Sequence, residues 1–478
     1  MESETKKCKN CKNDFTIEVE DFSFYEKIKI PTPKWCRECR QMRRMNFCNE
    51  RNLYKRKSDK TGKDIISVYS PDSPYKVFES SRANKLFFSH HSQDCVESSY
   101  LIDCRNCTNC FGCVSLVNKQ YHIFNQPYSK EEYTQFIKEN QGSYKRHLEN
   151  MNRLKGLDLI LPHRYARIYK SVNSDGDDLS EARNTHDSFS SRQAEDSKFL
   201  FFCRNGSKDC YDNSFQGFNS EMCYETAHTF GGNNAQFGTR IFSNQDTLYN
   251  EECHDCRNIF GCVGLRKKSY CIFNKQYTKE QYEGLTPKIM EHMNTMPYVD
   301  KRGLVYKYGE FFPSELSPFA YNETIAQEYF PLTKEGALGQ GYKWEDGETR
   351  NHKIDIETKD ILDHIKDITE DIVSKVIACE HTGKCKEQCT EAFKIIPEEF
   401  KFYKRMGLPL PRLCPNCRHY RRIGLRNPLK LWGRQCMCDK TSHANHLDIG
   451  CPSEFKTSYA PERPEIVCCE KCYQQEIY

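Results

Sequence analysis

The sequence predicts a mixed, β-rich fold: a parallel β-solenoid-like centre interrupted by helices, with small modules of the treble-clef or zinc-ribbon type at both ends. Two observations lead to this prediction. A cysteine-rich unit recurs near each end of the chain, and the middle consists of short apolar runs separated by Asn, Asp, Ser and Gly without a helical period. We expect seven parts, which are zinc finger 1 (1–60), a first solenoid-like segment (61–133), a helical linker (134–180), a second solenoid-like segment (181–283), a helical connector (284–378), zinc finger 2 (379–435) and a zinc-binding tail (436–478).

The terminal unit spans residues 8–44 and recurs as residues 385–422. A shift of 378 positions places Cys36 and Cys39 on Cys414 and Cys417, together with matching Phe, Ile, Pro and Arg residues around them. A match of this length, in order, indicates duplication.

The cysteine spacing within the unit predicts a metal site. Two cysteines separated by two residues wrap a turn around one ion, and a second such pair completes a tetrahedral zinc site. The candidate ligands are Cys8, Cys11, Cys36 and Cys39 in finger 1 and Cys385, Cys389, Cys414 and Cys417 in finger 2. The first pair of finger 2 is wider by one residue, so Cys379 is an alternative ligand there. Unligated structural thiols are the alternative in both fingers, but closely paired thiols without a secretory signal favour zinc over disulfides.

Between the cysteine pairs of finger 1, the alternation of Phe15, Ile17 and Val19 predicts a short strand. Residues 37–44 contain good helix formers and no breaker, so the second pair should open a helix. Its arginines would then project in a fixed array toward phosphates. The candidate nucleic-acid contacts are Arg37, Arg40, Arg43, Arg44, Arg418, Arg421 and Arg422, with Trp35 or Tyr420 stacking on a base.

Charge is unevenly distributed along the chain. Residues 1–63 hold 17 Lys and Arg against 10 Asp and Glu, and residues 380–440 hold 14 against 6, whereas the whole chain has a net charge of only +4. Basic ends that flank an acidic middle fit contact with a polyanion, although a solvated basic surface explains the charge equally well. No apolar run approaches the ~20 residues of a membrane span. With 28 cysteines and no signal peptide, a reducing cytoplasm is the expected compartment.

A second repeat lies in the middle of the chain, where residues 104–133 recur as residues 253–282. The spacing of Cys104, Cys107, Cys110 and Cys113 resembles an iron–sulfur run. However, Cys110 corresponds to Ile259, and a position that accepts either residue behaves as a buried apolar site. We therefore expect core packing rather than metal ligation, with Asn at corners where a left-handed backbone is tolerated.

Helices are expected at three further places. Ser129 with Glu132, and Thr278 with Gln281, form capping boxes that should each start a helix covering an end of a stack. Isoleucines at helical spacing over 358–377 predict an amphipathic helix that packs against the solenoid or against finger 2.

The C-terminal tail has a third set of closely spaced thiols. We expect Cys438, Cys451, Cys469 and Cys472 to bind a further zinc ion, with Cys436, Cys468, His443 and His446 as competing ligands. Zinc would replace a hydrophobic core that so short a segment cannot supply.

Several motifs together resemble an uncharacterised zinc-ribbon family of candidate-phylum bacteria. They are the first finger with its arginine run, the Phe-Gly-Cys blocks at 111–113 and 260–262, the segment 308–332, and the ending 460–473. The resemblance covers most of the chain and implies no established activity. Some members carry a CoA-transferase name, which no catalytic constellation in this sequence supports.

The leading functional interpretation is a cytoplasmic zinc protein whose fingers contact nucleic acid, RNA or ribosome in preference to a DNA sequence. The alternative is a protein–protein scaffold with structural fingers and a solenoid binding surface. An enzyme ranks third, because no G-x-S-x-G, Walker or H-E-x-x-H motif occurs. A three-ligand zinc site around Cys438, His446 and Cys451 would reopen that possibility.

Overall fold

We analysed a computed structural model of the chain. It describes residues 2–57, 64–67, 92, 95, 97–203, 206–215, 220–227, 233–237, 239, 243–346, 352–441, 443–444, 446 and 450–477. The chain divides into two compact units, of which unit 1 comprises Met1–Ser80, Ala166–Asp346 and Leu429–Leu431, and unit 2 comprises Ser81–Tyr165, Gly347–Pro428 and Trp432–Tyr478. The fold is mixed and β-rich, with many small sheets. Much of the predicted first solenoid-like segment, including most of residues 58–96, lies outside the described residues.

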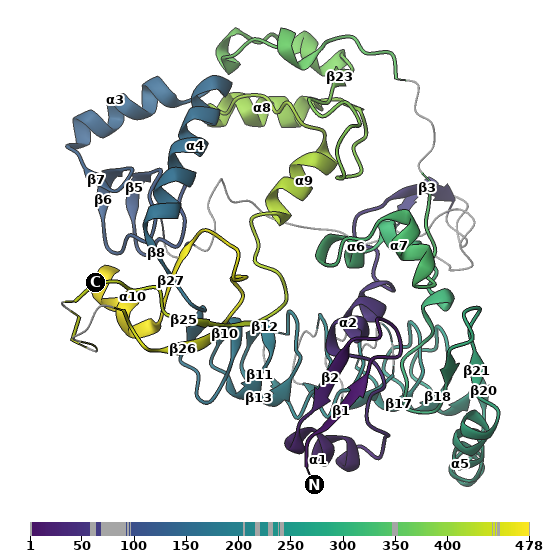
Figure 1. Ribbon diagram of the computed structural model, residues 1–478. Helices are drawn as coiled ribbons and strands as arrows, with labels where there is room; N and C mark the ends of the chain where they lie inside the picture. The colour runs from purple at the N-terminus through teal and green to yellow at the C-terminus, as the bar shows by residue number, and fades with distance from the viewer. Residues whose placement is uncertain are drawn as a thin grey trace. The chain divides into compact units, whose positions relative to one another are not determined.

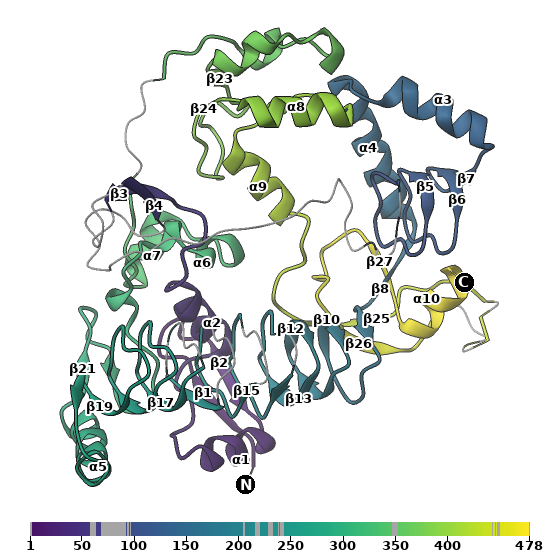
Figure 2. The ribbon, with the colours of Figure 1, turned by 180° about the vertical axis from the view of Figure 1, so that it is seen from behind.

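Unit 1 is built on a row of short strands that Figures 1 and 2 show from opposite sides. A three-stranded sheet contains β9 (Ile168–Tyr169), β10 (Gly176–Ser180) and β12 (Ser188–Arg192). A nine-stranded sheet contains β11 (Arg183–His186), β13 (Ala194–Lys198), β14 (Ser207–Lys208), β15 (Ser220–Glu221), β16 (Asn233–Gln236), β17 (Gln245–Leu248), β18 (Arg257–Phe260), β19 (Ser269–Ile272) and β20 (Lys275–Gln276). Neighbours pair in parallel until β19, which pairs antiparallel with β20.

The strand pairs of this row keep a nearly constant register. Thr247 pairs with Ile259, twelve residues later, and Ser207 pairs with Ser220, thirteen residues later. Over much of the row, every third residue has a positive φ, which is the left-handed backbone conformation. In one stretch these residues are Tyr249, Glu252, Asp255, Asn258, Gly261, Gly264, Lys267, Tyr270 and Phe273. Asn and Gly tolerate this conformation at low cost, and Asn258 of the row adopts it, as do Asn106 and Asn118 of unit 2.

Many of the side chains buried inside the row are small, and some of them are polar. Ser188 is fully buried, yet its hydroxyl donates to the carbonyl of His186 at 2.8 Å and accepts from the N–H of Leu200 at 3.1 Å. Buried thiols make the same kind of contact, since Cys262 donates to the carbonyl of Phe260 at 3.4 Å. A polar group buried in this way replaces its water contacts with backbone contacts, which removes most of the cost of burial.

Unit 1 also holds the N-terminal module and several short elements. The module contains β1 (Glu4–Lys7), β2 (Asp14–Ile17), α1 (Val19–Lys27) and α2 (Arg37–Met45). The other elements are β3 (Tyr54–Lys57), β4 (Asp64–Ser67), α5 (Lys279–Thr295), β21 (Tyr298–Val299), β22 (Val305–Tyr306), η1 (Ser314–Leu316), η2 (Tyr321–Glu323), α6 (Ile325–Tyr329) and α7 (Lys334–Gly339). The predicted helix over 37–44 is confirmed, and the predicted strand is confirmed up to Ile17, after which Val19 already starts α1.

Unit 2 contains the second module, the tail and a helical pair. Its elements are β5 (Thr108–Phe111), β6 (Gln120–Ile123), β7 (Gln126–Pro127), α3 (Lys130–Asn140), α4 (Tyr144–Ile160), β8 (Pro162–Arg164), η3 (Thr358–Asp360), η4 (Ile365–Asp367), η5 (Glu370–Ser374), β23 (Ile377–Ala378), β24 (Ala392–Phe393), α8 (Pro397–Met406), α9 (Pro415–Ile423), β25 (Trp432–Gln435), β26 (Glu454–Thr457), β27 (Ile466–Cys468) and α10 (Glu470–Ile477). Both predicted capping boxes are confirmed, at the starts of α3 and α5. None of the described helices is both long and apolar enough to cross a membrane.

The predicted amphipathic helix over 358–377 is wrong. The segment forms three short 3₁₀ helices, η3, η4 and η5, joined by extended residues. Side chains three residues apart share a face in a 3₁₀ helix as well, so the apolar spacing did not distinguish the two structures. The predicted packing against finger 2 is confirmed, because Ile361, Ile365, Ile368 and Ile372 share one buried core with Phe393, Phe400 and Leu413.

Candidate metal centres

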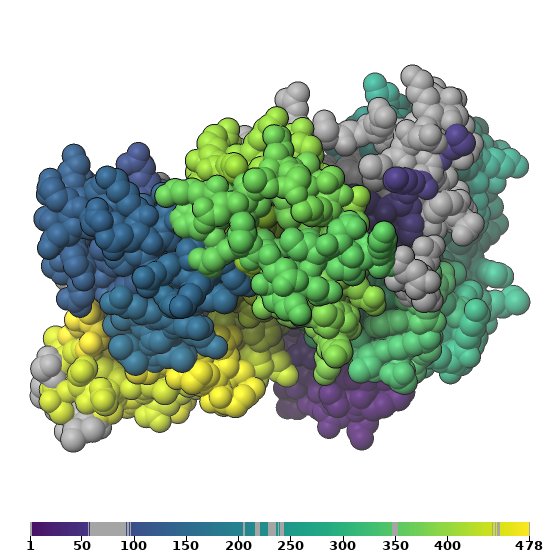
Figure 3. Space-filling model, turned by 90° about the horizontal axis from the view of Figure 1, so that it is seen from above, coloured from purple at the N-terminus to yellow at the C-terminus, as the bar shows by residue number. Residues whose placement is uncertain are grey.

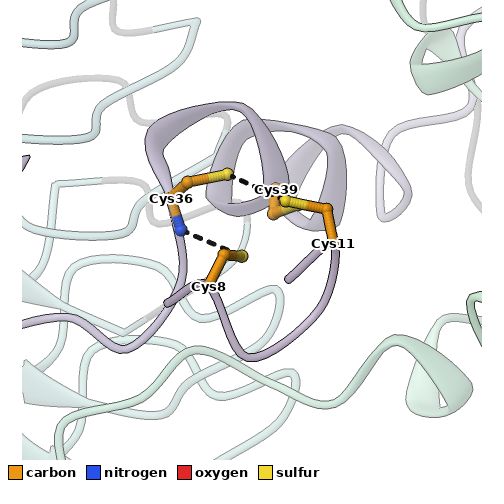
Figure 4. Close-up of side chains that lie close together, drawn as sticks. All are labelled: Cys8, Cys11, Cys36 and Cys39. Atoms are coloured by element: carbon orange, nitrogen blue, oxygen red, sulfur yellow. Dashed lines mark hydrogen bonds between the residues drawn. The ribbon is translucent and has the colours of Figure 1, made fainter. Parts of the chain in front are cut away.

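Four cysteines of the N-terminal module converge as the spacing predicts. Cys8 directly follows β1, Cys11 lies in the turn before β2, Cys36 caps the N-terminus of α2, and Cys39 lies in its first turn (Figure 4). The antiparallel pairing of β1 with β2 brings the first two cysteines to one end of a hairpin. All four sulfurs lie within 4.8 Å of one another.

The geometry of this group fits a tetrahedral zinc ion. The sulfurs of Cys11 and Cys36 are 3.7 Å apart, and zinc–sulfur bonds of about 2.3 Å imply sulfur separations of about 3.8 Å. The N–H of Cys36 donates to the sulfur of Cys8 at 3.2 Å, and Asn10 donates to Cys39 at 3.4 Å. Contacts with Cys36 and Cys39 hold the pKa of the Cys8 thiol far below its ordinary value, whereas contacts with Cys36 and Cys8 raise the pKa of Cys39. Without a cation the group thus favours a thiolate at Cys8 and a neutral thiol at Cys39, and a divalent cation would favour thiolates at all four positions.

The arginines of α2 do not face solvent. Arg40, Arg43 and Arg44 are 2%, 1% and 0% exposed. Asp212, which is itself buried, accepts from Arg40 Nε at 2.9 Å and from Arg44 at 3.4 Å. Glu225 accepts from Arg43 at 2.7 Å. These carboxylates belong to the strand row of unit 1, so ion pairs attach the module to that row.

This arrangement corrects the predicted nucleic-acid contacts of finger 1. A phosphate cannot reach Arg40, Arg43 or Arg44, because each guanidinium is enclosed and paired with a carboxylate. Arg37 is half-buried, with its guanidinium 5.0 Å from the centre of the Phe189 ring. Trp35 is also buried, and Arg43 stacks over it at 4.5 Å, so it cannot stack on a base.

The second module gathers a different set of thiols from the one predicted. Cys379, Cys389, Cys414 and Cys417 form the all-thiol group, with every pair of sulfurs within 4.8 Å. Cys385 instead lies in a mixed group with His381, Glu387 and Cys417, and its sulfur is 3.6 Å from that of Cys417. Burial raises the pKa of Cys414, but hydrogen bonds from the Cys417 N–H and Thr390 outweigh it and lower the pKa to about 6.

Local structure explains why Cys379 takes this place. Cys379 directly follows β23, as Cys8 directly follows β1. The N–H of Cys414 donates to the sulfur of Cys379 at 3.2 Å, which repeats the bond from Cys36 to Cys8. The loop from Cys379 to Cys389 is longer than the loop from Cys8 to Cys11, and the shift of 378 places Cys8 on Lys386, so the repeat alone did not identify this ligand.

The arginines of α9 are more exposed than those of α2. Arg418 is half-buried and donates to Glu399 at 3.1 Å, whereas Arg421 and Arg422 are exposed. Light-green residues of this module reach the surface in the view of Figure 3. Of the predicted nucleic-acid contacts, these two guanidiniums are therefore the ones that the structure presents to solvent.

In the tail, three of the four predicted ligands come together with a different fourth residue. Cys451, Cys469 and Cys472 group with Cys436. The fourth predicted ligand, Cys438, lies with His443, His446 and again Cys472. The sequence named all of these residues as competing ligands but did not divide them into two sets.

The four thiols of residues 104–113 are buried but do not converge on one another as metal ligands. Cys104, Cys107, Cys110 and Cys113 are fully buried, and each donates to backbone carbonyls, as Cys110 does to Thr108 at 3.6 Å. Among the residues that the structure describes, no group of converging metal ligands includes them. Their contacts agree with the predicted core packing.

Sequence reasoning missed Asp212 and Glu225, the partners of the α2 arginines. Each of them follows a Cys-Tyr dipeptide in the strand row, in the sequences Cys210-Tyr211-Asp212 and Cys223-Tyr224-Glu225. This shared pattern was the available signal. Its meaning depends on a tertiary contact that the local sequence does not encode.

No protein-family model, curated protein or solved structure matches the chain significantly. The resemblance to the zinc-ribbon family stays a prediction, and the assignment of function depends on the geometry described above.

We predict that Arg43→Met destabilises the protein by about 3–5 kcal/mol, because it leaves the Glu225 carboxylate buried without its cation. Arg43→Met combined with Glu225→Gln should recover part of this loss. Urea unfolding of the zinc-loaded protein measures both. Arg421→Met, at the matching exposed position of α9, serves as the control and should change stability by less than about 0.5 kcal/mol. Equal costs at positions 43 and 421 would contradict the buried ion pair.

We also predict that Cys379→Ser removes one zinc ion from the chain under competition with a moderate chelator, whereas Cys385→Ser retains it. The reason is that Cys379 belongs to the all-thiol group and Cys385 does not. Zinc content per chain measures the difference, and Cys203→Ser is a control in a buried thiol that belongs to none of these groups. Loss of zinc from Cys385→Ser alone would show that Cys385, and not Cys379, is the fourth ligand.

Proposed function

We propose that this chain is a binding protein whose zinc sites are structural. The observation that carries the proposal is the closure of the metal groups in both modules: each has four thiols within 4.8 Å of one another, from a strand end, a loop and a helix start. Four protein ligands fill a tetrahedral zinc ion and leave no position for a reactive water. In unit 1 the same module is attached through buried ion pairs, which suits a fixed scaffold.

The strand row of unit 1 supplies the binding surface in this proposal. Parallel pairing at a register of twelve or thirteen residues, with a left-handed residue at every third position, supports a β-solenoid for this segment. Solenoids present long, regular faces to partners. Phe273 and Val263 of this segment are 67% and 51% exposed, so apolar side chains are available for such a contact.

Cobalt substitution tests whether the sites are structural. We expect the visible spectrum of the Co²⁺-loaded protein to show tetrahedral thiolate ligation and to remain unchanged on adding azide, because no position is open. Cys11→Ser, which removes an exposed ligand, is the positive control and should become sensitive to azide. An azide-dependent change in the unaltered protein would reveal an open, catalytic type of site and would overturn the proposal.

A second candidate function is contact with RNA through the second module. It is supported by exposed basic residues on α8 and α9 and just after them, which are Lys401, Lys404, Arg405, Arg421, Arg422 and Arg426. Guanidiniums in such an array bind phosphates by charge and hydrogen bonding. Finger 1 takes no part in this candidate function, since Arg40, Arg43 and Arg44 are enclosed.

Charge reversal tests the second candidate. We expect Arg421→Glu with Arg422→Glu to weaken binding of single-stranded RNA at least tenfold and to reduce the slope of log K against log salt by about 1.4, for two lost phosphate contacts. Fluorescence anisotropy at several salt concentrations measures this. Lys12→Glu with Lys29→Glu makes the same charge change on exposed residues of module 1 and should have little effect. Equal loss in both variants, or no RNA binding by the unaltered protein, would remove this candidate.

A further inference from the structure

We propose that the tail holds two metal ions that share the thiolate of Cys472. One ion would be bound by Cys436, Cys451, Cys469 and Cys472, and the other by Cys438, His443, His446 and Cys472. The proposal extends the zinc-binding function given above and depends on it only in the choice of metal.

The first set repeats the geometry of the terminal modules. Cys436 directly follows β25, and Cys469 and Cys472 lie at the start of α10. The N–H of Cys469 donates to the sulfur of Cys436 at 3.2 Å, as Cys36 does to Cys8 and Cys414 to Cys379. The sulfurs of Cys451 and Cys469 are 3.9 Å apart, close to the edge of a zinc–sulfur tetrahedron. A strand end and a helix start thus form a third site of the same kind.

The second set has two histidines that are positioned as ligands. His443 Nδ1 lies 3.2 Å from the sulfur of Cys438, and His446 Nε2 lies 3.4 Å from the sulfur of Cys472. The other ring nitrogen of His443 is 2.8 Å from a carboxylate oxygen of Glu476. Such a carboxylate holds the proton on Nε2 and leaves Nδ1 free for a metal, which is the usual outer support of a metal-bound histidine.

One ion cannot satisfy all seven ligand atoms. A single tetrahedral zinc ion uses four of them and leaves three buried polar groups in a segment whose core is otherwise mostly cysteine. The two sets contain five different cysteines, so one Zn²⁺ with all thiolates would carry a net charge of −3. Two Zn²⁺ ions reduce this charge to −1. Burial of charge is therefore much less costly with two ions than with one.

Cys468 shows that proximity in sequence alone does not make a ligand here. It is buried beside Cys469, but it lies in β27, which pairs with β8. It belongs to no group of converging ligands among the described residues. The two sets are selected by the folding of the tail, and only Cys472 belongs to both.

The test is a comparison of zinc content per chain in the full-length protein. We expect His443→Ala with His446→Ala to contain one zinc ion fewer than the unaltered protein, and Cys436→Ser with Cys451→Ser also to contain at least one fewer. His292→Ala with His352→Ala, both exposed and outside the tail, is the control and should keep the full content. Full zinc content in the His443/His446 variant would overturn the second site. If the terminal modules bound no zinc, the total would fall while these differences remained, so the two proposals fail separately.

Cadmium-113 NMR of the unaltered, cadmium-loaded protein provides a second measurement that needs no variant to fold. A shared thiolate connects the two tail ions through two bonds. We expect two of the cadmium signals to show scalar coupling to each other, and Cys468→Ser to leave that coupling in place. Absence of any cadmium–cadmium coupling would overturn the shared ligand.

Discussion

The repulsion between closely spaced thiolates is the constraint on which the small modules depend. Four sulfurs within 4.8 Å of one another would be unstable as anions without a cation, and as neutral thiols they would form only weak hydrogen bonds. A metal ion bound by all four sulfurs would replace this repulsion with attraction. Helix N-termini at Cys36 and Cys414 add a favourable partial positive charge beside the sulfurs. If a metal ion binds there, folding and metal binding are one process in these modules.

The two modules share one design and use it differently. Helices α2 and α9 carry arginines at matching positions, with ligands at matching positions in their first turn. In unit 1 the arginines are desolvated and neutralised by Asp212 and Glu225, and removing either partner would leave a buried charge. In the second module Arg421 and Arg422 stay in water. The same sequence pattern thus attaches one module to the strand row of its unit, whereas in the other module two of the matching arginines are exposed.

The strand row reaches stability without a large apolar interior. Several of its buried side chains hydrogen-bond to backbone carbonyls of their own strand and of the next, as Thr185 does to Arg183 and Ala194. Aromatic residues such as Tyr211 and Tyr224 pack outward against Phe24 and Tyr25 of the N-terminal module. The row and the module therefore share a core, and each covers a surface that the other would otherwise expose to water.

By itself the sequence determined the local features: the convergence of Cys8, Cys11, Cys36 and Cys39, the helix at the second pair, the capping boxes, and Asn residues with a left-handed backbone. These follow from spacing and backbone preference, which act over a few residues. Tertiary structure decided which thiols complete the second module and the tail, where the arginines of α2 point, and that residues 358–377 form 3₁₀ turns. Those outcomes depend on loop length and on partners such as Asp212, which lies 172 residues from Arg40. Interactions across such separations leave no periodic trace in the sequence, so only the folded chain could assign them.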